Sequence, residues 1–175
     1  NTLSAQSGER LEPPAVPPRE LIDVLAAAKR PVVVGHITPD VDALGSMLGL
    51  ARALPTNEAA IALPGIPVSG KLRFLLELGD NVPLADAARI AEADVVAVVD
   101  TATTARVNVP GKWESIADKL VVNIDHHITN PDFGRINWVV DNASSTSELI
   151  YRLLVAAGWP VDPRTASILF AGIYS

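Results

Sequence analysis

The chain has 175 residues, of which 49% are hydrophobic and 19% are charged, so it can build a core and is not a disordered segment. Its formal net charge is −6. This excludes a broad basic surface for gripping nucleic-acid backbones and leaves an anionic substrate to be attracted locally, for example by a bound metal ion. The sequence contains no cysteine, which excludes disulfides, thiolate catalysis and cysteine-ligated metal sites and is compatible with a reducing cytoplasm.

The sequence predicts one domain behind a short leader. Residues 1–19 are rich in serine, glycine and proline and predict a flexible leader, and residues 20–175 are expected to form the domain. No stretch reaches the ~18 apolar residues that a membrane span needs, so we expect no contact with a membrane. The hydrophobic pattern predicts helices over 20–29, 42–54, 71–78, 145–157 and 163–170, and strands over 32–34, 59–63, 95–99, 120–124 and 136–140.

The order of these elements predicts the fold class. Helices and short apolar strands alternate along the domain, as they do in βαβ units. The strands at 32–34 and 95–99 are apolar at every position, which is typical of strands buried on both faces of a parallel sheet. We therefore expect an α/β fold, with an open, mostly parallel, Rossmann-like sheet and helices on both of its faces.

Histidine and aspartate gather where the predicted strands end. They are His36, Asp40 and Asp42 after the first strand, Asp100 after the third, and Asp125, His126 and His127 after the fourth. In open α/β sheets the ligand crevice lies at the carboxyl ends of the strands, so we expect these side chains to converge there. Carboxylates crowded together repel one another strongly, and divalent cations would remove that conflict.

The donor set favours two hard cations. It offers only carboxylate oxygen and imidazole nitrogen, which favours Mn²⁺, with Mg²⁺ as the alternative. Asp40 and Asp42 are two residues apart and can serve neighbouring ions if a third aspartate bridges them, and Asp100 is the natural bridge. Two such ions about 3.5–4 Å apart activate a water molecule at neutral pH and neutralise phosphoryl oxygens. An acidic chain could hold an anionic substrate in this way.

Four segments carry a resemblance to a known family. They are G-H-I-T-P-D-V-D-A-L-G-S (35–46), V-V-D-T-A (98–102), N-I-D-H-H-I-T-N (123–130) and A-S-S-T-S-E-L-I-Y (143–151). In this order they resemble the DHH phosphoesterases, and most of all the bacterial oligoribonucleases that also dephosphorylate 3′-phosphoadenosine 5′-phosphate (pAp). The resemblance covers residues 20 to 175.

The resemblance implies a role for each candidate residue. The metal ligands would be His36, Asp40 and Asp100 for the first ion, and Asp42, Asp100 and His126 for the second. His127 would face the substrate phosphate as a catalytic residue, and Asp125 would orient a neighbouring histidine. Further candidates are Arg106, Ser144, Ser145 and Thr146 for contacts with substrate, and Thr38 and Ser46 for local support.

Two departures from the family pattern affect these expectations. The family has glycine between the first two motif aspartates, where this chain has Val41, so the turn must tolerate a β-branched residue. The terminal A-G-I-Y-S (171–175) resembles a fourth motif that continues, in the family, with an aspartate ligand of the second metal. We therefore expect the N-terminal part of a longer enzyme, without the C-terminal substrate-binding domain and with a weak second metal site.

Simpler structural roles compete with these roles. A lone histidine or aspartate is more often a packing, capping or turn residue, and the clustering of His36 with two aspartates is what favours ligation. The stretch 144–146, with Glu148, is typical of a helix N-cap and capping box. Arg106 is typical of a solvated loop arginine, and the three tryptophans are typical of packing rather than base-stacking residues.

The resulting expectation is a Mn²⁺-dependent phosphoesterase of the bacterial cytoplasm that acts on short single-stranded RNA or pAp, and the sequence allows a homodimer. An inorganic pyrophosphatase or a cyclic-dinucleotide phosphodiesterase with the same metal centre is an alternative, because the metal ligands do not separate these substrates. A non-catalytic nucleotide-binding module that has kept the site is an alternative of a different class.

Overall fold

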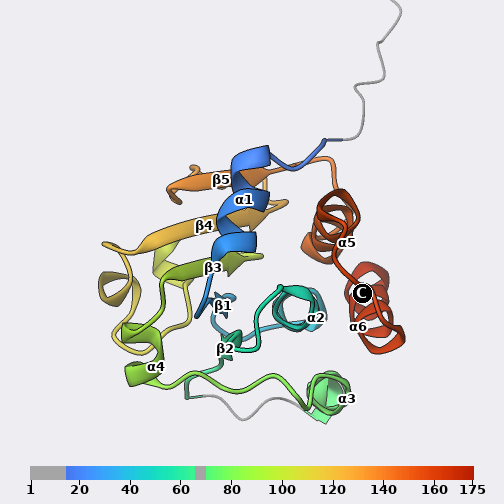
Figure 1. Ribbon diagram of the computed structural model, residues 1–175, viewed down its shortest axis with the longest axis horizontal. Helices are drawn as coiled ribbons and strands as arrows, with labels where there is room; N and C mark the ends of the chain where they lie inside the picture. Colours follow the sequence, from blue (N-terminus) through green and yellow to red (C-terminus); the bar gives the residue numbers. More distant parts are fainter. Residues whose placement is uncertain (1–14, 66–69) are drawn as a thin grey trace, which may run out of the picture.

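The computed structural model describes residues 15–65 and 70–175 (Figure 1). The helices are α1 (Arg19–Ala27), α2 (Val41–Ala53), α3 (Arg73–Leu78), α4 (Ala87–Ala91), α5 (Thr146–Ala157) and α6 (Pro163–Tyr174), with short 3-10 helices η1 (Gly70–Leu72), η2 (Thr104–Arg106) and η3 (Trp113–Ser115). The strands are β1 (Val32–Val34), β2 (Ala60–Ala62), β3 (Val95–Val99), β4 (Leu120–Asp125) and β5 (Ile136–Val139). Most of the expected leader, residues 1–14, lies outside the described residues, and Pro17 just before α1 is buried.

The five strands form one sheet in the order β2-β1-β3-β4-β5. Every pairing is parallel, and Val33 in the centre of β1 lies opposite Ile61 on one side and Ala97 on the other. The chain first adds β2 on one side of β1 and then crosses to add β3 on the other side. The carboxyl ends of β1 and β3 therefore flank the point at which open α/β sheets bind their ligands.

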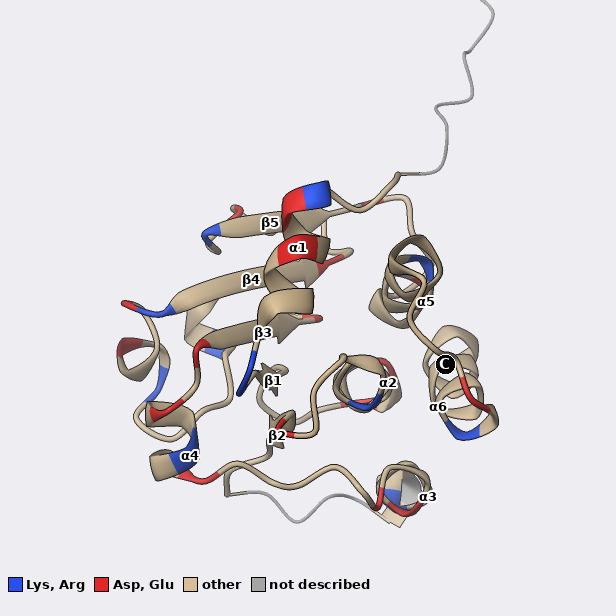
Figure 2. Cartoon of the chain, in the orientation of Figure 1, with Lys and Arg blue, Asp and Glu red and all other residues tan. Residues whose placement is uncertain are grey.

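Helices cover both faces of the sheet, as the alternation of elements predicts. Successive strand residues point to opposite faces, so Val33 and Ala97 join one core with α1, α2 and α5, while Val34 and Val98 join a second core. The second core is covered by the short α4 and by the segment around η3. Figure 1 shows the longer helices α2, α5 and α6 together on one side, and Figure 2 shows charged residues mainly in connections and on helices.

The largest differences between the expected and the observed elements concern α4 and α6. The five-residue α4 has no sequence signature of its own, because so short a helix completes little more than one turn of apolar periodicity. Helix α6 runs to Tyr174 instead of ending near residue 170. Within the part of the chain that the structure describes, no helix is long and apolar enough to cross a membrane.

Two glycines let α6 lie close to its neighbours. A Cβ added at Gly49 of α2 would stand 2.3 Å from Leu169 Cδ2, and one at Gly172 of α6 would stand 2.0 Å from Ser147 Oγ in α5. Neither space admits a methyl group, so the helix backbones pack directly on their partners. As a result, the last turn of α6 reaches the first turns of α2 and α5.

Candidate metal centre

The candidate site lies where the carboxyl ends of the central strands meet the first turns of α2 and α5. His36 follows β1, Asp100 follows β3, and His126 and His127 follow β4. A cavity of about 350 Å³ opens there, lined by His36, Asp40, Val41, Asp42, Asp100, His126, His127, Ser144, Ser145, Gly172, Ile173 and Ser175. The structure thus brings the residues expected to bind metal to one edge of the sheet.

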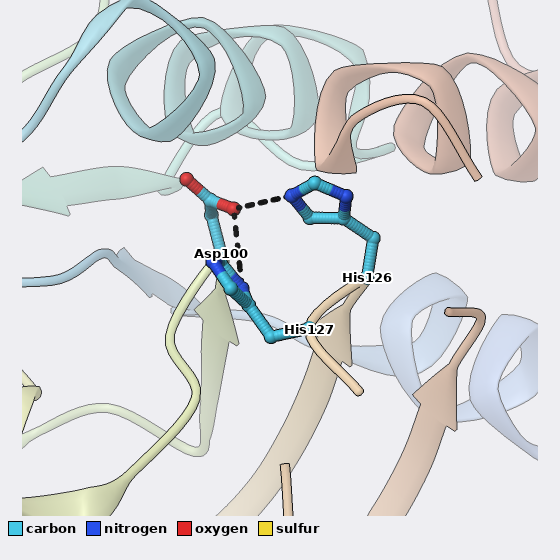
Figure 3. Close-up of side chains that lie close together, drawn as sticks. All are labelled: Asp100, His126 and His127. Atoms are coloured by element: carbon cyan, nitrogen blue, oxygen red, sulfur yellow. Dashed lines mark ion pairs between the residues drawn. The ribbon is translucent and has the colours of Figure 1, made fainter. Parts of the chain in front are cut away.

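Asp100 lies at the centre of this cluster. Asp100 is only 2% exposed. Its backbone has a φ of 51°, a left-handed conformation that is uncommon for a residue other than glycine. The carboxylate is divided between two histidines: Oδ2 lies 3.6 Å from His36 Nε2, and Oδ1 lies 3.6 Å from His126 Nε2. Figure 3 shows the Oδ1 side, where both His126 and His127 approach the same oxygen. Backbone strain of this kind concentrates at functional sites.

The distances between nitrogen and oxygen fit a shared cation better than a direct hydrogen bond. His36 Nε2 lies 3.9 Å from Asp40 Oδ1, and the two contacts of Asp100 measure 3.6 Å. All exceed the length of a good hydrogen bond. Two ligands each about 2.1 Å from one ion stand about 3.0–3.6 Å apart, depending on the angle between them. The donor atoms are therefore spaced nearly as they would be around an ion.

Two compact groups of possible ligands share Asp100. His36, Asp40 and Asp100 form one group, and Asp100, His126 and His127 form the other; within each group the ligand atoms lie within 4.8 Å of one another. Asp42, the ligand expected beside His126, is close to the second group, with Oδ2 3.8 Å from His126 Nε2. Asp100 thus lies between the two groups, and each of two ions would find two carboxylate oxygens and one imidazole nitrogen, from His36, Asp40 and Asp100 or from His126, Asp42 and Asp100.

Backbone carbonyls fix which nitrogen each histidine presents. His36 Nδ1 lies 2.7 Å from the carbonyl oxygen of Ile37, and His126 Nδ1 lies 3.3 Å from that of Ala143. A carbonyl oxygen only accepts, so Nδ1 carries the proton in both rings and the lone pair is on Nε2. Both Nε2 atoms face the carboxylates, which is the tautomer that a metal ligand requires.

The first turn of α2 presents Asp40 and Asp42 differently. Asp40 is the N-cap of α2, and its Oδ1 accepts a hydrogen bond of 2.9 Å from the backbone N–H of Ala43. Val41 is the first helical residue and has no positive φ. The glycine that the family has at this position is therefore not required by the backbone here, and the turn accommodates valine. The left-handed residue in this loop is instead Thr38, with a φ of 53°.

Asp42 is held by a helix distant in sequence. Its two carboxylate oxygens accept 2.8 Å hydrogen bonds from the backbone N–H groups of Thr146 and Ser147, in the first turn of α5. Burial, and after it the Asp100 carboxylate, raise the pKa of Asp42 against the opposing effect of these hydrogen bonds. Burial and the neighbouring carboxylate both disfavour the ionised form of Asp42, and a bound cation would favour it.

The ionised form of Asp100, unlike that of Asp42, is favoured by its surroundings. Burial raises the pKa of Asp100, but the interactions with His36 and Thr146 outweigh it, so that the pKa lies below its ordinary value. The Asp100 carboxylate in turn raises the pKa of His36, against the effect of burial. Asp100 therefore stays ionised, as a ligand shared by two cations must.

His127 is oriented by a second carboxylate behind it. Its Nδ1 lies 2.7 Å from Asp125 Oδ1, and Asp125 is fully buried. Asp125 also accepts hydrogen bonds from the backbone N–H of His126 at 2.8 Å and from Asn130 Nδ2 at 2.7 Å. With Nδ1 engaged by Asp125, Nε2 is the nitrogen that His127 can offer to a ligand in the cavity.

The residues expected to contact substrate differ in whether they line the cavity. Ser144 and Ser145 line the cavity, and Ser145 is also the N-cap of α5, where its Oγ accepts a 3.0 Å hydrogen bond from Glu148 N–H. Thr146 is fully buried and its hydroxyl donates to Asp100 at 2.9 Å. Arg106 is exposed in η2, with Nη2 3.5 Å from His36 Nδ1, on the side of the ring that faces away from the carboxylates.

The supporting residues and the tryptophans have local roles. Thr38 Oγ1 donates to the carbonyl of Ile37, and the buried Ser46 donates to the carbonyl of Ala43 within α2. Trp138 is 5% exposed and belongs to a core, as the sequence predicts. Trp113 packs edge-on against Phe133.

Two residues that support this site were not predicted from the sequence. Asn130 contacts Asp125, the side chain of Asn123 and the carbonyl of Thr101 through its Nδ2, and so ties β4 to the loop after β3. Asn130 ends the D-H-H-I-T-N segment, which was the available signal. Gly172 keeps the space beside Ser147, and a lone glycine near a helix end gives no comparable signal.

A comparison with protein families decides the relationship. The model of the DHH family, N-terminal domain, matches residues 30–173. The chain belongs to the DHH family. The resemblance carried by the four sequence segments is therefore confirmed, and the fold described above is the DHH domain of this chain.

Individual relatives of the DHH domain include two curated bacterial proteins. The bifunctional oligoribonuclease and PAP phosphatase NrnA of Bacillus subtilis is 33% identical over 161 residues, which are 88% of this chain and 48% of the relative. The protein of the same name from Thermus thermophilus is 31% identical over 158 residues, 89% of this chain and 46% of the relative. The chain thus spans about half the length of these relatives.

A solved structure has the same fold. The crystal structure of an exopolyphosphatase-related protein from Bacteroides fragilis superimposes with a TM-score of 0.72 and 26% sequence identity. The match covers 87% of this chain and 47% of that one. The fold of this chain is therefore shared with that protein.

Proposed function

We propose that the DHH domain is the metal-binding part of a hydrolase that cleaves phosphoester bonds with the help of two divalent cations. The observation that carries this proposal is the position of Asp100. Its two carboxylate oxygens face different histidines, so one residue can serve two ions at once. The surrounding donors are oxygens and imidazole nitrogens, which suit Mn²⁺ and also admit Mg²⁺.

The side chains divide into ligands and supports. His36, Asp40 and Asp100 would hold one cation, and Asp100, His126 and Asp42 the other. When bound, such a pair of ions supplies the positive charge that activates a water molecule and neutralises phosphoryl oxygens. The α5 amides and the Ile37 and Ala143 carbonyls keep the carboxylates and imidazoles in place before an ion arrives.

His127 is proposed to act on the substrate directly. It lines the cavity, and 43% of its side chain is exposed, more than for either of the other two histidines. Asp125 accepts from Nδ1–H, and in the doubly protonated ring Nε2–H would donate a hydrogen bond to a phosphoryl oxygen as charge develops there. Ser144 and Ser145, which also line the cavity, are the proposed additional contacts for that oxygen.

The proposed substrates are short RNA oligonucleotides and pAp. Support comes from the names of the two NrnA relatives, which describe an oligoribonuclease and a PAP phosphatase. Because the chain spans about half of those proteins, we propose that residues 20–175 work within a longer enzyme of the bacterial cytoplasm. Size-exclusion chromatography of that protein tests the homodimer that the sequence allows.

The test uses the full-length protein with Mn²⁺. Release of mononucleotide from a short oligoribonucleotide, or of phosphate from pAp, is the expected result, and both should stop when EDTA is added or when Asp100 is replaced by asparagine. The same preparations should be tested on pyrophosphate, polyphosphate and cyclic di-AMP. Absence of product from both RNA and pAp would reject the substrate assignment.

Phosphoanhydride hydrolysis is the second candidate, because the structural relative from B. fragilis is named as exopolyphosphatase-related. Turnover of polyphosphate or pyrophosphate, with RNA and pAp left intact, would favour it. Tight nucleotide binding without any Mn²⁺-stimulated turnover would instead favour the non-catalytic module.

A further inference from the structure

Thr146 donates hydrogen bonds to two of the central carboxylates. Its backbone N–H donates a 2.8 Å hydrogen bond to Asp42 Oδ2, and its Oγ1 donates a 2.9 Å hydrogen bond to Asp100 Oδ1. Asp42 comes from the first turn of α2 and Asp100 from the end of β3, so two elements that are distant in sequence meet at one residue of α5.

The surroundings of Thr146 fix its hydroxyl group in place. The residue is fully buried and begins α5 directly after the N-cap Ser145. A threonine side chain has few rotamers in a helix because of its branch at Cβ. The hydroxyl is already engaged with Asp100 and does not line the cavity, in contrast to the neighbouring Ser144 and Ser145. Thr146 is therefore placed to orient a ligand rather than to touch substrate.

The hydrogen bond from Thr146 fixes the oxygen of Asp100 that faces His126. Asp100 Oδ1 lies 3.6 Å from His126 Nε2, whereas Oδ2, which Thr146 does not touch, faces His36. A hydroxyl donor at Oδ1 restrains rotation of the carboxylate about its last bond. The same residue also holds Asp42 Oδ2, which lies 3.8 Å from His126 Nε2, so it sets the spacing of the two carboxylates beside the second ion.

We propose that Thr146 is the positioning residue of the second cation site, and that its hydroxyl holds Asp100 in the orientation in which it bridges two ions. This inference rests on the metal centre under "Proposed function". It predicts an asymmetric effect: loss of the hydroxyl weakens the ion held between Asp42, Asp100 and His126, and affects the ion beside His36 much less.

The test variant is Thr146→Val in the full-length protein, because valine keeps the shape and the backbone N–H but has no hydroxyl. Loss of a partner that orients a metal ligand typically costs 10–100-fold in affinity. We therefore expect the weaker of two Mn²⁺ binding events, followed by isothermal titration calorimetry, to lose about 10–100-fold in affinity. Thr146→Ser keeps the hydroxyl, so its Mn²⁺ affinity should stay within about threefold of that of the wild type.

Thr165→Val is the matched control. Thr165 is also a buried threonine in the first turn of a helix, with 2% exposure, and its Oγ1 accepts a 3.1 Å hydrogen bond from Arg52 Nε at the far end of α2. Replacing it removes a comparable buried hydrogen bond without touching the site. If lost stability alone explained the effect, Thr165→Val would weaken Mn²⁺ binding as much as Thr146→Val does.

The outcomes separate this inference from the proposed function. If the wild type binds no Mn²⁺, the metal centre itself is refuted. If the wild type binds two ions and Thr146→Val binds both equally well, the metal centre stands and the role of Thr146 is wrong. Equal weakening of both ions, or failure of Thr146→Ser to restore binding, would also overturn it. In the activity assay, the expected loss in Thr146→Val lies in kcat at limiting Mn²⁺ and is reduced by added Mn²⁺.

Discussion

Gly172 gives the sharpest test of how α6 supports the site. Replacement by alanine would place a methyl carbon 2.0 Å from Ser147 Oγ and 2.7 Å from Ser147 Cβ, and 3.4 Å from Asp42 Oδ1. The hydroxyl can rotate away, but Ser147 Cβ cannot, so α6 and α5 must separate by about 1 Å to regain an ordinary contact. Because Ser147 N–H holds Asp42, the movement is transmitted to a proposed metal ligand.

The expected magnitude follows from two opposing effects. Overpacking in a close contact costs about 1–3 kcal/mol, and alanine is favoured over glycine in a helix by about 1 kcal/mol. We therefore expect Gly172→Ala to lower the free energy of unfolding by about 0–2 kcal/mol. The displaced Asp42 should weaken Mn²⁺ binding by about tenfold or more. Urea unfolding measures the first effect and calorimetric titration with Mn²⁺ the second.

A matched glycine separates this effect from the general effect of a glycine-to-alanine change. Gly70 begins the 3-10 helix η1, and an added Cβ there meets nothing within 4 Å. Gly70→Ala should leave both stability and Mn²⁺ affinity unchanged. Adding Ser147→Gly to Gly172→Ala removes both clashing atoms and should recover metal affinity. An unfolding free energy and a binding isotherm of Gly172→Ala that match the wild type would refute the reasoning.

Three further predictions address the metal centre and the framework. Asp100→Asn should abolish both Mn²⁺ binding events while the fold survives, because asparagine tolerates the φ of 51°; retention of either event in calorimetry would contradict the bridging role. Arg89→Met should lower the free energy of unfolding by about 1–3 kcal/mol, because the guanidinium donates to three backbone carbonyls just before β1 and β2. The exposed Arg19→Met is its control, with an expected loss of under about 1 kcal/mol. Burial raises the pKa of Asp94, but hydrogen bonds from two backbone N–H groups outweigh it, and the pKa lies below the ordinary 3.8. The stabilisation is complete above that ordinary value and is lost as the pH falls through the lower folded value. Asp94→Asn should therefore be less stable than the wild type at pH 7, and urea unfolding near pH 3 should show a smaller gap.

The sequence predicts the placement of the ligands because of a simple topological rule. His36, Asp100 and His126 each follow a buried strand, and parallel strands end at the same edge of a sheet. Short apolar runs are enough to locate such strands. The convergence of residues 36, 100 and 126 could therefore be predicted from their positions relative to the apolar runs, and the family resemblance supplied the expected roles.

The contacts that orient those ligands could not be predicted in the same way. The hydrogen bond from Thr146 to Asp100 joins residues 46 positions apart and depends on the rotation of α5 about its own axis. Periodicity assigns a buried face to a helix but does not fix which single hydroxyl meets a carboxylate. The left-handed conformations of Thr38 and Asp100 were also unmarked, because neither residue is glycine. Such details are decided by tertiary packing.

The order of the site residues along the chain has a consequence for how the proposed metal centre would form during synthesis. The last proposed ligand along the chain, His126, emerges from the ribosome before Thr146 and Gly172 do, and synthesis at about 5–20 residues per second makes that interval a matter of seconds. During this interval, the carboxylates and imidazoles lack the contacts from α5 and α6 that hold them at fixed distances. A loose cluster of this kind binds divalent ions in the order of their intrinsic affinities, which favours copper and zinc over manganese. In the proposed metal centre, discrimination between ions would thus depend on the docking of α5 and α6.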